Sequence, residues 1–144
     1  MSTSTSKPGY LFWIIVVLAL LWNLAGVSQF FAQAMNTESW RANFTPEMLE
    51  IMDNLPLWYI VVFAIAVFIS TFACVFLLFR KKLAVPLFLI GFFAVTIQCT
   101  FNLFINEAKA FYGFGQIAIT IILPIVSFAL YWYARKCEKK GWLT

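Results

Sequence analysis

The sequence predicts an all-α membrane protein: a membrane four-helix bundle with a short amphipathic helix in the first outer loop. Three observations lead to this prediction: an apolar composition, four long apolar runs, and basic residues that gather beside those runs. Of the 144 residues, 63% are hydrophobic and 11% are charged, whereas soluble domains carry about 25% charged residues. Ten basic and six acidic residues are too few to cover a soluble fold of this size. Most of the surface must therefore face lipid.

Each of the four apolar runs can cross the hydrocarbon core of a bilayer. The runs occupy positions 10–33, 57–79, 83–106 and 114–133. Helices of about 20 residues, with a rise of about 1.5 Å per residue, span a core of about 30 Å. Such runs must be helical because lipid offers no hydrogen-bond partner to peptide groups. We therefore expect a transmembrane domain over 10–133, a flexible lead at 1–9 and a basic cytoplasmic tail at 134–144.

The distribution of basic residues predicts the orientation of the bundle. One side of the predicted spans carries Lys7, Arg80, Lys81, Lys82, Arg135, Lys136, Lys139 and Lys140. The other side carries only Arg41 and Lys109. Because positive loops stay inside, both chain ends and the connection between the second and third runs should face the cytosol. Nucleic-acid binding is not expected, since these cations flank apolar runs instead of forming a basic face.

The segment 34–56 is the predicted outer loop, and part of it should be helical. Thr45 can cap a helix whose first position is Pro46, and Glu47 favours the first turn of such a helix. Apolar residues then recur at helical spacing on one side. We expect a short amphipathic helix from Thr45 to Asn54 that lies on the outer membrane surface or caps the bundle.

Two rows of amide side chains are the most specific feature of the predicted spans. The first run carries Asn23, Gln29 and Gln33 on one arc of the helix, and the third run carries Gln98, Asn102 and Asn106 at four-residue intervals. An amide that faces lipid is costly, so both rows should face the bundle interior or an oligomer contact.

Two interpretations of these amides remain open. In the first, the rows hydrogen-bond each other and hold the helices together, at about 0.6 to 2 kcal/mol for each bond. In the second, they line an outward-facing pocket for a neutral ligand that bears hydroxyl or amide groups. The predicted walls of that pocket are aromatic: Phe30, Trp58, Phe101 and Phe104.

Most of the groups that catalysis or metal binding requires are missing from the sequence. Histidine is absent, and Cys74, Cys99 and Cys137 show no CxxC spacing. The spans carry no ionisable residue at their centres, and the chain has no glycine-rich phosphate loop. We therefore expect no catalytic residues, no metal site and no cofactor.

Three segments resemble a family of small bacterial inner-membrane proteins. They are Leu21 to Gly26, Leu55 to Trp58, and Leu77 to Ala84, which has the sequence LLFRKKLA. Some proteins of this family carry a loose sugar-transporter label. The resemblance covers most of the four-helix region and implies a compact four-helix unit in a bacterial inner membrane. It implies no substrate residues, because no binding motif of the family can be placed on this chain.

Two hypotheses about function follow. The chain could bind a neutral small molecule or pass it across the membrane. For transport, a second copy would have to supply the other half of the path, because transport sites commonly lie between two repeats. Alternatively, the chain could be a structural or accessory subunit whose amide rows dock a larger membrane partner. In both hypotheses the protein is not an enzyme, and its environment is the lipid bilayer.

Overall fold

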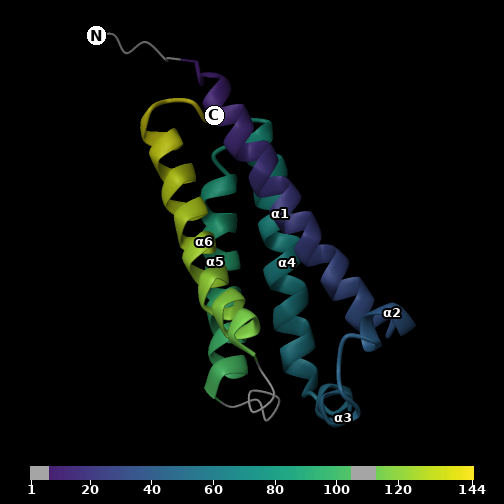
Figure 1. Cartoon of the computed structure of the whole chain (residues 1–144). Helices are drawn as coiled ribbons and strands as arrows, with labels where there is room; N and C mark the ends of the chain where they lie inside the picture. The colour runs from purple at the N-terminus through teal and green to yellow at the C-terminus, as the bar shows by residue number, and fades with distance from the viewer. Residues whose placement is uncertain (1–6, 105–112) are drawn as a thin grey trace.

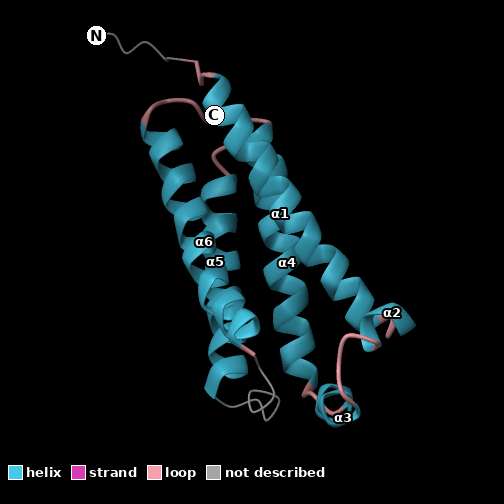
Figure 2. Cartoon of the chain, in the orientation of Figure 1, coloured by secondary structure: helices cyan, strands magenta, loops and turns pink. Residues whose placement is uncertain are grey.

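A computed structural model of the chain describes residues 7–104 and 113–144, and its regular structure there is entirely helical (Figures 1 and 2). The predicted fold class, an all-α four-helix bundle, is confirmed. The elements are α1 (Tyr10–Ala34), α2 (Glu38–Arg41), α3 (Pro46–Asp53), α4 (Leu57–Leu78), α5 (Ala84–Phe104) and α6 (Phe114–Lys139).

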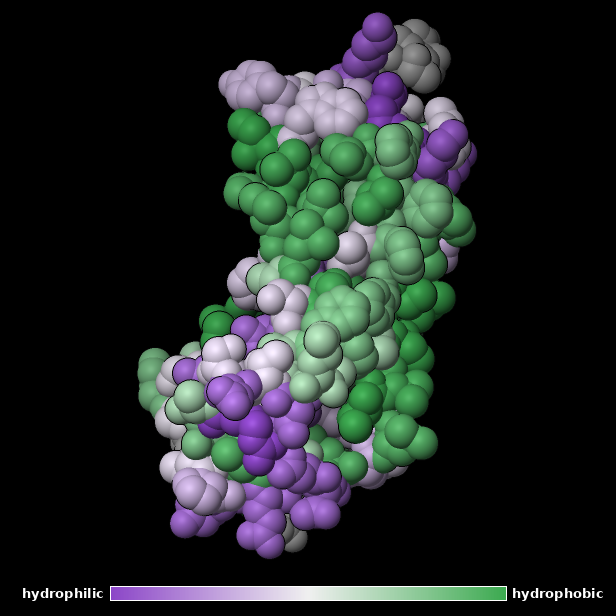
Figure 3. All heavy atoms as spheres, turned by 90° about the vertical axis from the view of Figure 1, so that its right-hand side faces the viewer, coloured by the Kyte–Doolittle hydropathy of each residue, from purple (hydrophilic) through white to green (hydrophobic). Residues whose placement is uncertain are grey.

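Four of these helices, α1, α4, α5 and α6, are long and apolar enough to cross a membrane. Figure 3 shows the result on one face of the molecule: an apolar belt separates two ends that carry hydrophilic side chains. The two short helices, α2 and α3, lie together at one of these ends (Figure 1). We call this end the loop end, and we call the opposite end, where the described chain begins and finishes, the terminal end.

The four long helices pack in the order α1, α4, α5, α6, so that α4 and α5 form the middle of the bundle (Figure 1). Small residues allow the close approaches. Gly91 of α5 faces Ser70 of α4, and Gly26 of α1 faces Val67 of α4. Since a Cβ atom on Gly26 would lie 3.3 Å from a Val67 methyl group, the α1–α4 contact leaves little room for a larger residue.

The main buried cluster sits at the terminal end of the bundle. It consists of Phe12, Val16, Ala19, Ala73, Cys74, Leu77, Ala84, Phe88, Ala134, Cys137 and Leu143. All four long helices and the segment after α6 contribute to it. Among the described residues, the buried apolar side chains are therefore concentrated at this end.

The predicted helix in the outer loop is confirmed as α3. The hydroxyl of Thr45 accepts a hydrogen bond from the Met48 amide at 3.3 Å, and Pro46 opens the helix. Both features were expected from the sequence. An N-cap hydroxyl accepts a hydrogen bond from a free amide of the first turn, and a proline at the first position has no amide hydrogen to leave unpaired. The four-residue helix α2, capped by Thr37 in the same way, was not predicted.

The sequence-based boundary at 133 is too early, because α6 continues to Lys139. Ala134 and Cys137 lie on the face of the helix that meets the bundle and are buried. The lysines of the same turns point elsewhere and are exposed. Residues 134–144 are thus not a separate tail. The helix continues past the length needed to cross the membrane, because apolar residues still recur at helical spacing on the face that meets the bundle.

The segment after α6 folds back onto the connection between α4 and α5. Gly141, with φ of 78°, reverses the chain, and the Trp142 amide then donates to the Cys137 carbonyl at 3.1 Å. The Thr144 amide donates to the Arg80 carbonyl at 2.8 Å, and the Lys82 amide donates to the Thr144 carbonyl at 3.0 Å. These bonds fix the last residues of the chain to the terminal end of the bundle.

Gly91→Ala tests the contact between α4 and α5. A Cβ atom at this position would collide with Oγ of Ser70, so we expect a loss of about 1 to 3 kcal/mol in unfolding free energy. Reversible unfolding in mixed micelles measures this loss. Combining the change with Ser70→Ala should recover part of it, whereas Gly115→Ala, which has open space around it, should cost nothing. Equal effects of Gly91→Ala and Gly115→Ala would refute the close contact.

Candidate functional site

The amide of Asn23 joins α1 to the central helix α4. Its Nδ2 atom donates to the Ala19 carbonyl at 2.8 Å and also contacts Sγ of Cys74 at 3.3 Å. The thiol is completely buried and the amide is half-buried. The hydrogen-bonding groups of Asn23 and Cys74 therefore find partners within the α1–α4 interface, where water is not available as a partner.

The amides of α5 meet the opposite side of α4 at Tyr59. Gln98 donates from Nε2 to the Tyr59 hydroxyl at 3.4 Å, and the side chain of Asn102 also interacts with this hydroxyl. Tyr59 is only 5% exposed, and its ring lies 5.1 Å from that of Phe101. A buried tyrosine usually has a partner for its hydroxyl, and the amides of α5 provide it.

One amide of the first row, Asn23, and two of the second, Gln98 and Asn102, thus interact with α4, which lies between α1 and α5. The first interpretation, in which the rows bond each other, requires this correction: α4 supplies the partners, Cys74 for one row and Tyr59 for the other. No local pattern in the sequence identifies these two residues as the partners. Tyr59 lies at the start of a span, where interfacial aromatics are common, and Cys74 is a small residue of the kind that packs between helices.

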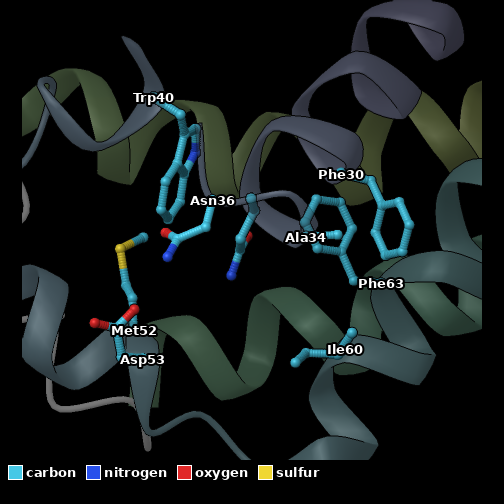
Figure 4. Close-up of a pocket in the computed structure, with 9 residues that line it drawn as sticks. Phe30, Ala34, Asn36, Trp40, Met52, Asp53, Ile60 and Phe63 are labelled. Atoms are coloured by element: carbon cyan, nitrogen blue, oxygen red, sulfur yellow. The ribbon is translucent and has the colours of Figure 1, made fainter. Parts of the chain in front are cut away.

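A pocket of about 210 Å³ opens at the loop end, between the end of α1, the start of α4 and the two short helices (Figure 4). Its lining combines aromatic rings with polar groups. The lining residues are Phe30, Gln33, Ala34, Asn36, Trp40, Met52, Asp53, Ile60 and Phe63. In Figure 4, Trp40, Asn36, Met52 and Asp53 lie on one side of the pocket, and Phe30 and Phe63 lie on the other.

The charged residues beside the pocket neutralise each other. Arg41 donates from Nη1 and Nη2 to the two carboxylate oxygens of Asp53, at 3.1 and 3.4 Å. The same guanidinium also donates to Oδ1 of Asn36 at 2.6 Å. The pocket therefore presents amide groups and a paired carboxylate, without an excess charge.

Local backbone geometry places Asn36 in this network. The residue ends α1 with φ of 56°, a left-handed conformation that asparagine tolerates better than most residues. The Thr37 amide then donates to the Ala32 carbonyl at 3.2 Å, which closes the helix as in a Schellman motif. Thr37 in turn caps α2 and so brings Trp40 over the pocket.

The structure brings only two of the predicted pocket residues, Gln33 and Phe30, to this pocket. Trp58 and Phe101 pack their rings against each other, with centroids 5.1 Å apart. Phe104 is 70% exposed on α5. Asn106 lies outside the described residues.

Gln29 also lies away from the pocket, exposed on the outer side of α1. The pocket residues that the sequence did not reveal come mainly from the loop: Asn36, Trp40, Met52 and Asp53. Periodicity within the spans could not reveal them, because their meeting depends on how two short helices fold back over the bundle.

The basic residues predicted to set the topology share the terminal end. Arg80, Lys81 and Lys82 follow α4, and Arg135, Lys136, Lys139 and Lys140 occupy the last turns of α6 or its cap. An even number of spanning helices brings both clusters to one side. Arg80 is additionally held there, because its Nε donates to the Trp142 carbonyl at 2.8 Å.

The fold and the distribution of polar groups define a class: a multi-pass α-helical membrane protein. Among residues 7–104 and 113–144, no three potential metal ligands gather at one point. No family model, curated protein or solved structure matches the chain. The resemblance to small bacterial inner-membrane proteins therefore stays a prediction.

Tyr59→Phe tests whether the α5 amides hold α4 and α5 together. We expect a loss of about 0.6 to 1.7 kcal/mol in unfolding free energy, the range of interhelical hydrogen bonds in membranes. A double-mutant cycle with Gln98→Leu should show coupling, measured by unfolding in mixed micelles. Thr100→Val, at an exposed position of α5, is the control. Strict additivity of the two changes would argue against the bond.

Proposed function

We propose that this protein binds a small neutral molecule in the loop-end pocket, and that it does so without catalysing a reaction. The observation that carries the proposal is the lining of the pocket, which combines the aromatic rings of Phe30, Trp40 and Phe63 with the amide groups of Gln33 and Asn36. Small-molecule sites combine apolar walls with a few convergent polar groups in this way. The amides deeper in the bundle are engaged with α4 and are not needed for binding.

Charge and size narrow the class of ligand. The ion pair between Arg41 and Asp53, at 3.1 Å, leaves the site without a net charge, which favours a neutral ligand over an ion. The volume of about 210 Å³ is below the roughly 300 Å³ at which typical drug-sized sites begin. A small polyol or amide that stacks on an aromatic face fits both limits.

The proposed location is a bacterial inner membrane, with the loop end outside and the terminal end in the cytosol. The support for this orientation is the concentration of basic residues at the terminal end, which the positive-inside rule assigns to the cytosol. The pocket would then collect its ligand from the side of the membrane that faces away from the cytosol. Passage across the membrane would require a second copy of the bundle, because transport sites commonly lie between two repeats.

A second function, that of an accessory subunit docked on a larger membrane protein, is favoured by Gln29. This amide is exposed on the outer side of α1, where a polar group from a partner helix could bond it. Purification in mild detergent separates the two functions. A protein that travels alone or as a homodimer supports ligand binding, whereas constant recovery with one larger protein supports the accessory role.

Gln33→Leu should abolish ligand binding without unfolding the protein, because this half-buried amide lines the pocket. Thermal unfolding is measured with and without neutral sugars and other polyols. A ligand at 100 times its dissociation constant stabilises the native state by about 2.7 kcal/mol. We expect this shift in the native protein and in Gln29→Leu, one turn away outside the pocket, but not in Gln33→Leu. Shifts that survive in Gln33→Leu would place binding elsewhere.

Cysteine labelling in intact cells tests the orientation. Ser39→Cys at the loop end should react with a membrane-impermeant maleimide, whereas Lys81→Cys should react only after the cells are opened. Both positions are exposed, and the three native cysteines are buried, so the native protein serves as the background control. Labelling of Lys81→Cys in sealed cells would reverse the proposed topology.

A further inference from the structure

A second cavity lies at the terminal end, between the first turns of α1 and the last turns of α6. Its volume is about 320 Å³, and its lining is almost wholly apolar. Phe12 and Ile15 contribute from α1, while Tyr133, Lys136 and Lys140 contribute from the other side. The cavity is remote from the loop-end pocket, at the opposite end of the bundle.

Aromatic rings connect the two sides of this cavity. The Phe12 ring, only 1% exposed, lies 6.4 Å from the Tyr133 ring and 5.8 Å from the Trp142 ring. The closely packed helix pairs are α1 with α4, α4 with α5, and α5 with α6. The first and last helices meet here through these rings, which leave the neighbouring space open.

Two lysines that line the cavity have their ammonium groups over tryptophan rings. Nζ of Lys136 lies 5.1 Å from the centre of the Trp132 ring, and Nζ of Lys140 lies 4.7 Å from the centre of the Trp142 ring. Cation–π contacts of this kind restrict where the ammonium groups can go. Among the described residues that line the cavity, none is acidic, so the local charge is positive.

The beginning of α1 adds to this positive potential. Gly9 lines the cavity and caps the helix without a side-chain hydrogen bond to its first amides. Those amides carry the partial positive charge of the helix dipole. The lysines and the first amides of α1 therefore both make the electrostatic potential of the cavity more positive.

We propose that this cavity binds an anionic phospholipid, with its phosphate beside Lys136 and Lys140 and an acyl chain against the apolar wall. The argument is charge complementarity combined with position. The lysines lie at the end of α6, a helix long and apolar enough to span a membrane. Headgroups would surround that end of the helix, and basic pockets between membrane-spanning helices suit lipid phosphates. A lipid seated here would fill the space between α1 and α6 and stabilise the native state by mass action.

Native mass spectrometry of the whole protein released from lipid nanodiscs tests the site. The probes are phosphatidylglycerol and phosphatidylcholine with identical acyl chains. We expect retained phosphatidylglycerol to exceed phosphatidylcholine in the native protein. The preference should fall about thirtyfold in Lys136→Gln/Lys140→Gln, since each of the two lysines contributes about 1 kcal/mol near a lipid headgroup. Lys81→Gln/Lys82→Gln, at the same end but outside the cavity, should keep it. Equal losses in both double variants would overturn the proposal.

A second pair of variants separates a lipid from a free anion. Leu11 lines the cavity and Leu18 does not, and both are exposed on α1. Leu11→Trp should displace the acyl chain and reduce phosphatidylglycerol retention, whereas Leu18→Trp should leave it unchanged. Millimolar inorganic phosphate should not compete. Competition by phosphate, or retention unaffected by Leu11→Trp, would show that the cavity holds no acyl chain and would overturn the proposal.

Discussion

The absence of hydrogen-bond partners in hydrocarbon is the constraint on which the rest of this structure depends. Peptide groups therefore bond to each other within helices, and polar side chains bond to other groups of the protein. The hydroxyls of Thr71, Thr96 and Thr120 donate to carbonyls one turn earlier, at 2.7, 2.8 and 2.7 Å. Across the described residues, no buried side-chain nitrogen or oxygen lacks a partner. The amides that cannot bond to their own helix must therefore find a neighbouring one.

The central position of α4 follows from this requirement. The thiol of Cys74 bonds to Asn23 on one side of α4, and the hydroxyl of Tyr59 bonds to Gln98 on the other. Glycines of the two neighbouring helices also pack closely against α4, at Val67 and Ser70. Because these polar groups at the centre are bonded to α4, the two proposed binding sites lie at the ends of the bundle. One end has amides and a paired carboxylate over aromatic rings, and the other has lysines beside an apolar cavity.

The sequence predicted the four long helices and the capped helix α3, because period, length and capping residues are local signals. It missed the continuation of α6 to Lys139, since a basic segment looks like a tail when its buried face cannot be seen. Gln33 and Phe30, neighbours on one helix, were predicted together, and both line the loop-end pocket. Trp40 and Asp53 could not be added to them, because their meeting depends on the tertiary fold of the loop. The burial of Tyr59 could not be predicted for the same reason, because only tertiary packing distinguishes an interfacial ring from a buried one.

Hydrogen–deuterium exchange of the protein in lipid nanodiscs tests the central claim most directly. If four helices satisfy their peptide groups in lipid, amides within α1, α4, α5 and α6 exchange slowly, while those of α2 and α3 at the loop end exchange quickly. Fast exchange throughout any one of the four long helices would contradict the account, because that segment could not then be a hydrogen-bonded helix buried in the membrane.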